Sequence, residues 1–285
     1  MSEEDITGLL ASQRYKIYQS NASLSLSGKL PRAKVDQFRT KFAKFLYKKY
    51  SLRSNLLKDI LEGYDTYRDI ASELTVFNGT IPDSKYKIQY FIVYCGNPKL
   101  SPRQVFLFIS DDQANTVVFN RMNSSGHGWI NDYVMDFLED VNEYPIIIKP
   151  FNLPEMFIPN LINEMSDYVE SLGDLSLVYM SPTSAKLRNL MVDIPRRDIR
   201  KVFKGKLYND INEFLYTHTK IKFEKLTIEK FTNNLLSISK DGLFKLSVKN
   251  RDLTWFLIES IKSALEEQPD EEEEDEDDDD VLEVV

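Results

Sequence analysis

The middle of the chain alternates apolar and polar positions with a period of two, which is typical of half-buried β-strands. β-Branched and aromatic residues are enriched there, and turn residues such as Asn97-Pro98 separate the runs. The pattern predicts consecutive strands at residues 74–77, 86–95, 104–110 and 115–121. An extended segment around Tyr15 and Ile17 follows a polar start. Further strands are predicted at residues 146–149 (as a buried strand), 175–180, 187–193 and 221–228.

Apolar residues three and four positions apart predict helices around these strands. The pattern is clearest after Pro31, which suits a first helical turn. One face of this helix is apolar and basic residues occupy much of the rest; the apolar positions are Val35, Phe38, Phe42, Phe45 and Leu46. Further helices are predicted at residues 54–64, 129–141, 161–172, 209–217 and 253–265.

Two alternating runs near the C-terminus, residues 235–240 and 243–248, flank Asp241-Gly242. Asp-Gly between such runs predicts a β-hairpin with a type I′ turn, in which both central residues have positive φ. If either strand lies at a sheet edge, its unpaired backbone groups offer a pairing site to a partner strand. The alternative is that the hairpin lies inside the sheet.

Strands in adjacent groups with helices at the ends favour an α+β fold over an alternating parallel sheet. We therefore expect antiparallel, curved β-sheets with flanking helices and a disordered acidic C-terminal tail. The predicted regions are an N-terminal strand and basic helix (1–72), a central sheet with helices (73–193), a helix-hairpin-helix pairing region (194–268) and the tail (269–285).

Charge is divided unevenly along the chain. The formal net charge of −9 combines 36 basic and 45 acidic residues, and 14 of the acidic ones lie from Glu266 onward, where no basic residue occurs. The first 265 residues therefore have 36 basic against 31 acidic residues, a net charge of +5. A basic body and an acidic tail have opposite preferences for nucleic acid.

Two segments carry most of the basic excess. Residues 29–58 have a net charge of +9 and residues 186–206 a net charge of +6. Clustered Lys and Arg suit non-specific contact with DNA phosphates, although a solvated helix face gives the same pattern. The candidate phosphate contacts are Lys34, Lys41, Lys44, Lys48, Arg196, Arg197, Arg200 and Lys201.

The acidic tail, with an unbroken run of acidic residues over 270–280, has three interpretations. It is a solubilising appendage, a screen for the basic body, or a site for histones. The third defines an alternative function, that of an acidic-tailed histone- or chromatin-binding adaptor.

The residue inventory argues against most catalytic chemistry. One Cys and two His cannot build a closed structural zinc site, and no glycine-rich phosphate loop occurs, so no cofactor is expected. A catalytic His127 in the loop with Ser124, Ser125 and Asp132 is conceivable, as is a Cys95 nucleophile. A surface loop and an inert buried thiol are the simpler interpretations, so we expect no enzyme.

The N-terminal sequence lacks a secretory signal pattern, and the longest aliphatic run, Ile146-Ile147-Ile148, is far too short to span a bilayer. We therefore expect a soluble intracellular protein with no membrane partner.

Several segments together resemble the centromere protein L family of inner-kinetochore subunits, including its budding-yeast homologues. The resemblance runs in one order over most of residues 15–265 and leaves out the tail and the loop at 123–129. The segments that carry it are Tyr15-Lys16-Ile17-Tyr18, Leu24-Ser25-Leu26, Phe91-Ile92-Val93-Tyr94-Cys95-Gly96, Asp193-Ile194-Pro195-Arg196, Asn209-Asp210-Ile211, the stretch from Thr219 to Glu224-Lys225-Leu226, the hairpin and Ser260-Ile261.

The resemblance implies a non-enzymatic scaffold in the nucleus, at the centromere and kinetochore. It implies pairing with a centromere protein N homologue through the C-terminal β region, contact with other inner-kinetochore subunits, and a contribution to binding DNA or the centromeric nucleosome. A homodimer of the chain alone stays open. Carried onto the hairpin, the implied pairing surface comprises Leu235, Ser237, Ser239, Phe244, Leu246 and Val248.

Overall fold

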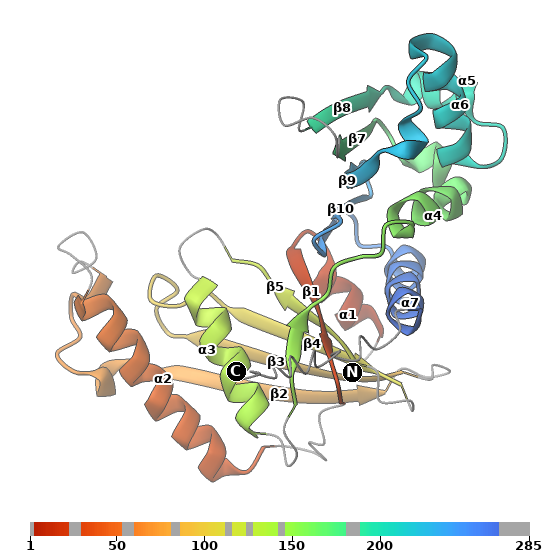
Figure 1. Ribbon diagram of the computed structural model, residues 1–285. Helices are drawn as coiled ribbons and strands as arrows, with labels where there is room; N and C mark the ends of the chain where they lie inside the picture. Colours follow the sequence, from red (N-terminus) through yellow and green to blue (C-terminus); the bar gives the residue numbers. More distant parts are fainter. Residues whose placement is uncertain are drawn as a thin grey trace, which may run out of the picture.

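Figure 1 shows the computed structural model, which describes residues 3–22, 30–52, 60–80, 86–111, 116–123, 128–141, 146–180 and 189–267. Within these residues the chain forms one open antiparallel sheet of 11 strands with helices packed on it. The predicted α+β class with an antiparallel sheet is confirmed. The acidic tail lies outside the described residues, as do the loop with His127 and most of the helix predicted at 54–64.

The sheet order places the first strand in the middle. Successive neighbours are β2 (Ser72–Thr80), β3 (Lys87–Cys95), β4 (Gln104–Ser110), β5 (Thr116–Arg121), β1 (Arg14–Ser20), β11 (Leu243–Leu246), β10 (Leu236–Ser239), β9 (Thr227–Thr232), β7 (Leu175–Met180) and β8 (Asn189–Ile194). The short strand β6 (Ile148–Pro150) also pairs with β1. Strand β1 therefore joins the meander β2–β5 to the strands from the second half of the chain.

Helices cover both faces of this sheet (Figure 1). They are α1 (Glu3–Leu10), α2 (Arg32–Leu52), α3 (Gly128–Val141), α4 (Phe157–Glu164), α5 (Arg196–Val202), α6 (Leu207–Thr219) and α7 (Arg251–Glu266). Short 3₁₀ turns add η2 (Tyr67–Asp69), η3 (Met165–Ser171) and η4 (Phe223–Lys225).

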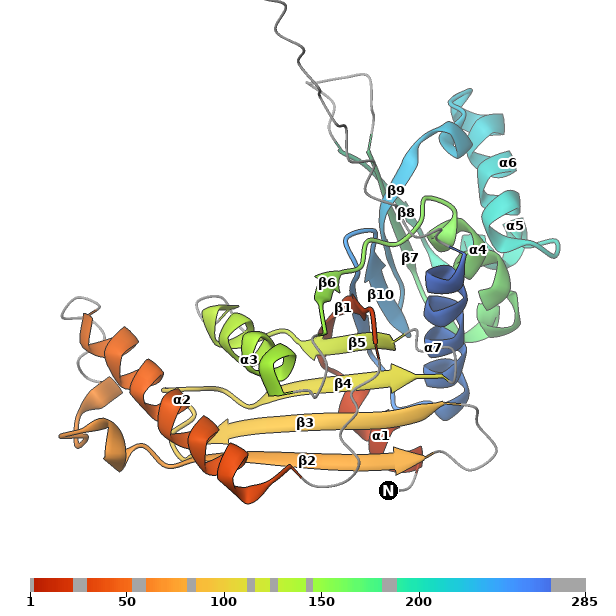
Figure 2. The same ribbon diagram turned by 60° about the horizontal axis from the view of Figure 1, so that its bottom comes forward.

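Two hydrophobic clusters result. In Figure 2, α2 and α3 lie on one face of β2–β5, where Phe38 and Phe42 of α2 pack with Phe91 and Phe106 of the sheet. The second cluster lies on the other face and continues along the C-terminal strands, under α1, α4–α6 and α7. The predicted apolar face of the helix after Pro31 is thus confirmed, with Phe38, Phe42 and Leu46 buried and Val35 and Phe45 partly buried.

Four predicted elements were wrong in part. The polar start contains helix α1, whose Ile6 and Leu10 are buried although it is only two turns long. The strand predicted at 221–228 begins as η4, and β9 starts at Thr227. The helix at 161–172 begins at Phe157 and continues as 3₁₀ turns from Met165. The strand at 146–149 is β6, whose residues are half-buried or exposed because it pairs only with β1 at the side of the sheet.

The hairpin turn also differs from the prediction. Only Gly242 has positive φ (79°), and its N–H donates to the Ser239 carbonyl at 2.9 Å. Ile238 pairs with Phe244. The loop thus has three residues and ends on a left-handed glycine, which is the usual alternative to a two-residue type I′ turn.

Candidate functional site

Both strands of the hairpin lie inside the sheet, which overturns their role as an exposed pairing edge. β10 lies between β9 and β11, and β11 lies between β10 and β1. The backbone groups of these strands are therefore paired along both sides. The prediction of an edge was wrong because an interior strand with one solvent-exposed face shows the same alternation of apolar and polar residues as an edge strand.

The residues assigned to the hairpin surface also fall on opposite faces of the sheet. Phe244 and Leu246 are about 1% exposed and belong to the hydrophobic core, whereas Ser237 and Ser239 are half-buried on the other face. Leu235 and Val248 lie beyond the ends of the two strands and pack partly against the core. These six positions cannot form one exposed surface.

The sheet as described has two ends, β2 and β8. β8 pairs with β7 along its whole length, from Leu175–Ile194 to Met180–Asn189. On the covered face of this pair, Leu190 and Val192 pack against the core. On the open face, Met191 pairs with Val178, and Met191 and Met180 are 67% and 40% exposed. Within the described residues, the β7–β8 end of the sheet thus combines an unpaired backbone edge on β8 with an exposed methionine on each strand. Sequence reasoning had not selected these residues.

The two predicted basic groups lie far apart in the fold. Lys34, Lys41, Lys44 and Lys48 are exposed on α2, at the meander side of the sheet, whereas Arg196, Arg197, Arg200 and Lys201 are exposed on α5, beside the β7–β8 end (Figure 1). The structure does not bring them together into one surface.

The basic side chains of α5 already contact oxygen atoms of neighbouring residues. Arg196 donates to the Glu170 carbonyl at 2.8 Å, and Arg200 pairs with the Glu170 carboxylate. Lys201 Nζ lies 3.1 Å and Arg197 Nε 3.9 Å from the Asp198 carboxylate. Exposed pairs of this kind are weak, yet they reduce the positive potential that a phosphate would meet.

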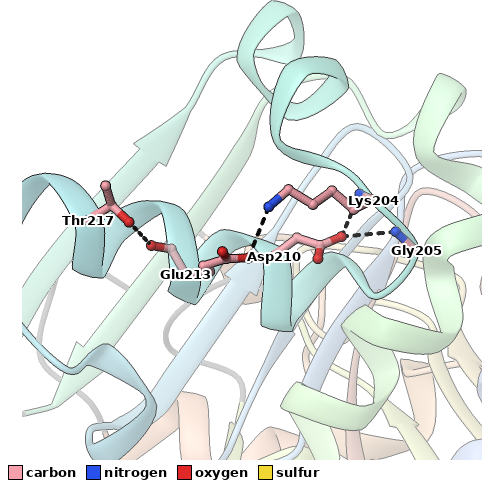
Figure 3. Close-up of polar contacts among 5 residues, drawn as sticks. All are labelled: Lys204, Gly205, Asp210, Glu213 and Thr217. Atoms are coloured by element: carbon pink, nitrogen blue, oxygen red, sulfur yellow. Dashed lines mark hydrogen bonds and ion pairs between the residues drawn. The ribbon is translucent and has the colours of Figure 1, made fainter.

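A surface pocket of about 470 Å³ lies beside α6. Figure 3 shows how the preceding loop is fixed: the Asp210 carboxylate accepts from the N–H groups of Lys204 and Gly205 at 2.6 and 3.0 Å, and Lys204 Nζ lies 3.1 Å from the Glu213 carboxylate. The lining residues are Tyr208, Asn209, Asn212, Glu213, Tyr216, Lys222 and Glu224. Their mixed charges give the pocket no clear preference for an anion or a cation.

A second pocket of about 510 Å³ lies between α2, η2 and the start of β2. Its charged walls come from Arg39, Arg68 and Glu73, and the buried residue Ser72 also lines it. Sequence reasoning missed this site because its residues come from three separate segments.

The catalytic alternatives gain little from the structure. Cys95 is buried at the end of β3, and burial raises the pKa of its thiol, which disfavours the nucleophilic thiolate. Asp132 is exposed on α3, while Ser124, Ser125 and His127 lie outside the described residues. Within the described ranges, no group of three or more His, Cys, Asp or Glu side chains could hold a metal ion. Among the described helices, none is long and apolar enough to cross a membrane.

The chain was compared with models of known protein families and with curated proteins. Neither comparison gave a match. The resemblance to the centromere protein L family therefore stays a prediction, and the functional argument depends on the surfaces described above.

Proposed function

We propose that the chain is a non-enzymatic scaffold subunit of the inner kinetochore, which pairs with a homologue of centromere protein N and helps to attach the kinetochore to centromeric chromatin in the nucleus. The resemblance described above supports the assembly and the partner. The observation that carries the mechanism is the edge of β8 in the second half of the chain, beside which the described residues place no further strand.

β8 replaces the hairpin as the proposed pairing strand. An edge strand offers unpaired N–H and C=O groups, and a partner strand that adds to it gains main-chain hydrogen bonds. Beside this edge, the open face carries Met191, Val178 and Met180, so a partner that extends the sheet also covers apolar side chains. Backbone pairing and burial of the methionine face both supply affinity.

The same edge of β8 pairs with β8 of a second copy of the chain when the partner is absent. Two β8 strands related by a two-fold axis run antiparallel, which is the pairing that this sheet uses throughout. The proposal therefore includes a homodimer of the chain alone, which the heterodimer replaces.

Co-expression with a centromere protein N homologue tests the assignment. The expected result is a stoichiometric heterodimer on size-exclusion chromatography with light scattering. Separate elution of the two chains at micromolar concentration would contradict the proposed function, whatever the DNA affinity of either chain.

A further inference from the structure

The sheet ends opposite β8 at β2, which α2 crosses in Figure 2. The pocket between α2, η2 and the start of β2 lies at this end. Its walls come from Arg39 and Thr40 of α2, Tyr67 and Arg68 of η2, and Ser72 of β2. Apolar floor residues are Ala43, Ile70 and Ala71. The site thus joins polar side chains of α2 and η2 at the beginning of β2, whose outer edge is unpaired within the part of the chain that the structure describes.

Two polar atoms beside this pocket lack a hydrogen-bond partner among the residues that the structure describes. They are Nε of Arg39 and Oγ of Ser72, and both atoms are sealed from solvent. The groups that a ligand in the pocket can reach are therefore the exposed parts of the Arg39 and Arg68 side chains.

Cations surround the aromatic ring at the rim of the pocket. Lys44 Nζ lies 5.1 Å and the Arg68 guanidinium carbon 5.9 Å from the centre of the Tyr67 ring. A hydrogen bond from Arg68, helped by the charge of Lys44, lowers the pKa of the Tyr67 hydroxyl. The local potential therefore favours negative charge at this rim.

The nearby carboxylates are engaged elsewhere or are weakly held. Glu73 accepts from the Tyr94 hydroxyl, and Asp69 accepts from the Thr66 N–H at 2.7 Å. Asp36 lies 3.8 Å from a guanidinium nitrogen of Arg39, and both side chains are well exposed, so a better acceptor can displace it.

We propose that this pocket binds an anionic side chain, a carboxylate or a phosphorylated residue, from an extended segment of another protein that lies along the free edge of β2. The guanidinium groups of Arg39 and Arg68 hold the anion, as arginine clusters do in acidic and phosphopeptide recognition. Nine residues of β2, about 30 Å of edge, pair with the rest of the segment.

A duplex nucleic acid suits this site less well. The pocket is concave, and Glu73 forms one wall with the apolar Ala43 and Ile70 nearby. A duplex would bring several closely spaced phosphates to a pocket whose wall includes the Glu73 carboxylate. A single anionic side chain avoids this repulsion.

The acidic tail of the same chain is the competing occupant, and truncation of the tail distinguishes it from a second protein. Lys262, near the end of α7, contacts Asp111, which follows the strand position paired with Lys87 at the start of β3. Ser72 pairs with Cys95 at the opposite end of β3, about 27 Å away, a distance that about eight extended residues span.

The test measures binding of labelled peptides to the full-length chain by fluorescence polarisation. The probes share the sequence Thr-X-Thr-Val-Thr-Val-Thr-Lys, with phosphoserine, Glu or Gln at X. We expect the phosphoserine and Glu peptides to bind at least about tenfold more tightly than the Gln peptide. Their ratio shows which anion the pocket prefers. No difference between the three, or no saturable binding up to about 1 mM, overturns the proposal.

Variants locate the site. The double change Arg39→Gln, Arg68→Gln should lower the affinity for the phosphoserine peptide by at least about tenfold and leave the affinity for the Gln peptide unchanged. Arg197→Gln, an exposed arginine on α5, is the matched control and should change nothing. If the double variant and the control bind the phosphoserine peptide equally well, the assignment of the binding site to this pocket is overturned. Both pocket arginines are substantially exposed, so thermal melting should be unchanged and serves as the folding check.

Two further arms test the occupant. The same phosphoserine peptide with proline in place of both valines cannot pair with β2. If it binds as tightly as the valine peptide, the claim that the bound segment pairs with β2 is overturned. Truncation after Gln268 should leave the peptide affinity unchanged; a rise of about tenfold or more would mean that the tail fills the pocket, against the proposal. None of these results depends on pairing at β8.

Discussion

Lys262 Nζ on α7 lies 2.7 Å from a carboxylate oxygen of Asp111, at the end of β4, and the two side chains are only 1% and 5% exposed. The ammonium group also lies 5.9 Å from the centre of the Tyr86 ring. This buried ion pair ties the C-terminal helix to the meander β2–β5. It joins segments about 150 residues apart, and nothing in the apolar stripe of α7 had indicated it.

Asp111→Ala should lower the free energy of unfolding by about 3–5 kcal/mol, because it leaves the Lys262 charge buried and uncompensated. The double variant Asp111→Leu, Lys262→Met removes both charges and should be more stable than the single variant. Urea titration followed by circular dichroism measures both. Glu213→Ala breaks the exposed pair with Lys204 and is the control, with an expected loss below about 1 kcal/mol. Equal losses for the two single variants would contradict the role of the buried pair.

Gly242→Ala should destabilise the chain by about 2 kcal/mol or more. Gly242 has φ of 79°, and an added Cβ would lie 2.4 Å from the Phe151 carbonyl oxygen, which belongs to the backbone and cannot rotate away. Gly63→Ala is the matched control, since its φ is 87° but no atom lies within 4 Å of the added Cβ. A smaller loss at Gly242 than at Gly63 by the same urea titration would show that the hairpin turn does not contact the segment before α4 so closely.

Stability should fall between about pH 10 and pH 12 through Tyr15. Burial raises the pKa of Tyr15 to about 12, while nearby Arg121 and Arg103 lower it less. Above pH 10 the unfolded chain releases the phenolic proton and the folded chain keeps it, so folding loses about 2–3 kcal/mol by about pH 12. Tyr15→Phe should reduce this loss. At about pH 8 the variant should cost only about 1 kcal/mol, for the lost 2.7 Å hydrogen bond to the Leu9 carbonyl. If the free energies of unfolding of the Tyr15→Phe variant and the parent chain differed by the same amount at about pH 8 and at about pH 11, Tyr15 would not be the source of the alkaline loss.

Non-specific DNA binding, if the chain uses it, should depend more on α2 than on α5. Lys41→Glu, Lys48→Glu should lower duplex affinity and flatten its salt dependence, because each phosphate contact contributes about 0.9 to the logarithmic slope. Arg197→Glu, Lys201→Glu is the control, on a helix whose cations already pair with acidic residues. Lys44 is kept unchanged because it lies against Tyr67. A larger effect of the α5 variant in filter-binding titrations would reverse the assignment.

Local pattern predicted most elements and little of their arrangement. The runs that became β3, β4, β7 and α3 were predicted to within one or two residues, because alternation and helical period are local properties. The place of β1 between β5 and β11 depends on contacts across about 100 residues or more, for which the strand itself carries no signal. The hairpin illustrates the consequence: its strands were recognised, yet their position inside the sheet was not.

The candidate sites divide in the same way. The basic face of α2 follows from helical spacing alone, so its exposed lysines were found. The pocket at β2 requires Arg39, Arg68 and Ser72 to meet from three segments, and only the folded chain brings them together. The exposed Met191 alternates with Leu190 and Val192, but whether such a residue faces water or a neighbouring sheet depends on what covers that face.

The most direct test of the central claim compares two substitutions in the complex with a centromere protein N homologue. Met191→Asp places a charge on the open face of the β8 edge, whereas Lys245→Asp places one on an exposed position of β11, inside the sheet. Affinity is measured by titration calorimetry, with thermal melting of each variant alone as the folding check. The account predicts a loss of about tenfold or more for Met191→Asp and no change for Lys245→Asp. Unchanged affinity for Met191→Asp, with a loss for Lys245→Asp, would contradict pairing at β8.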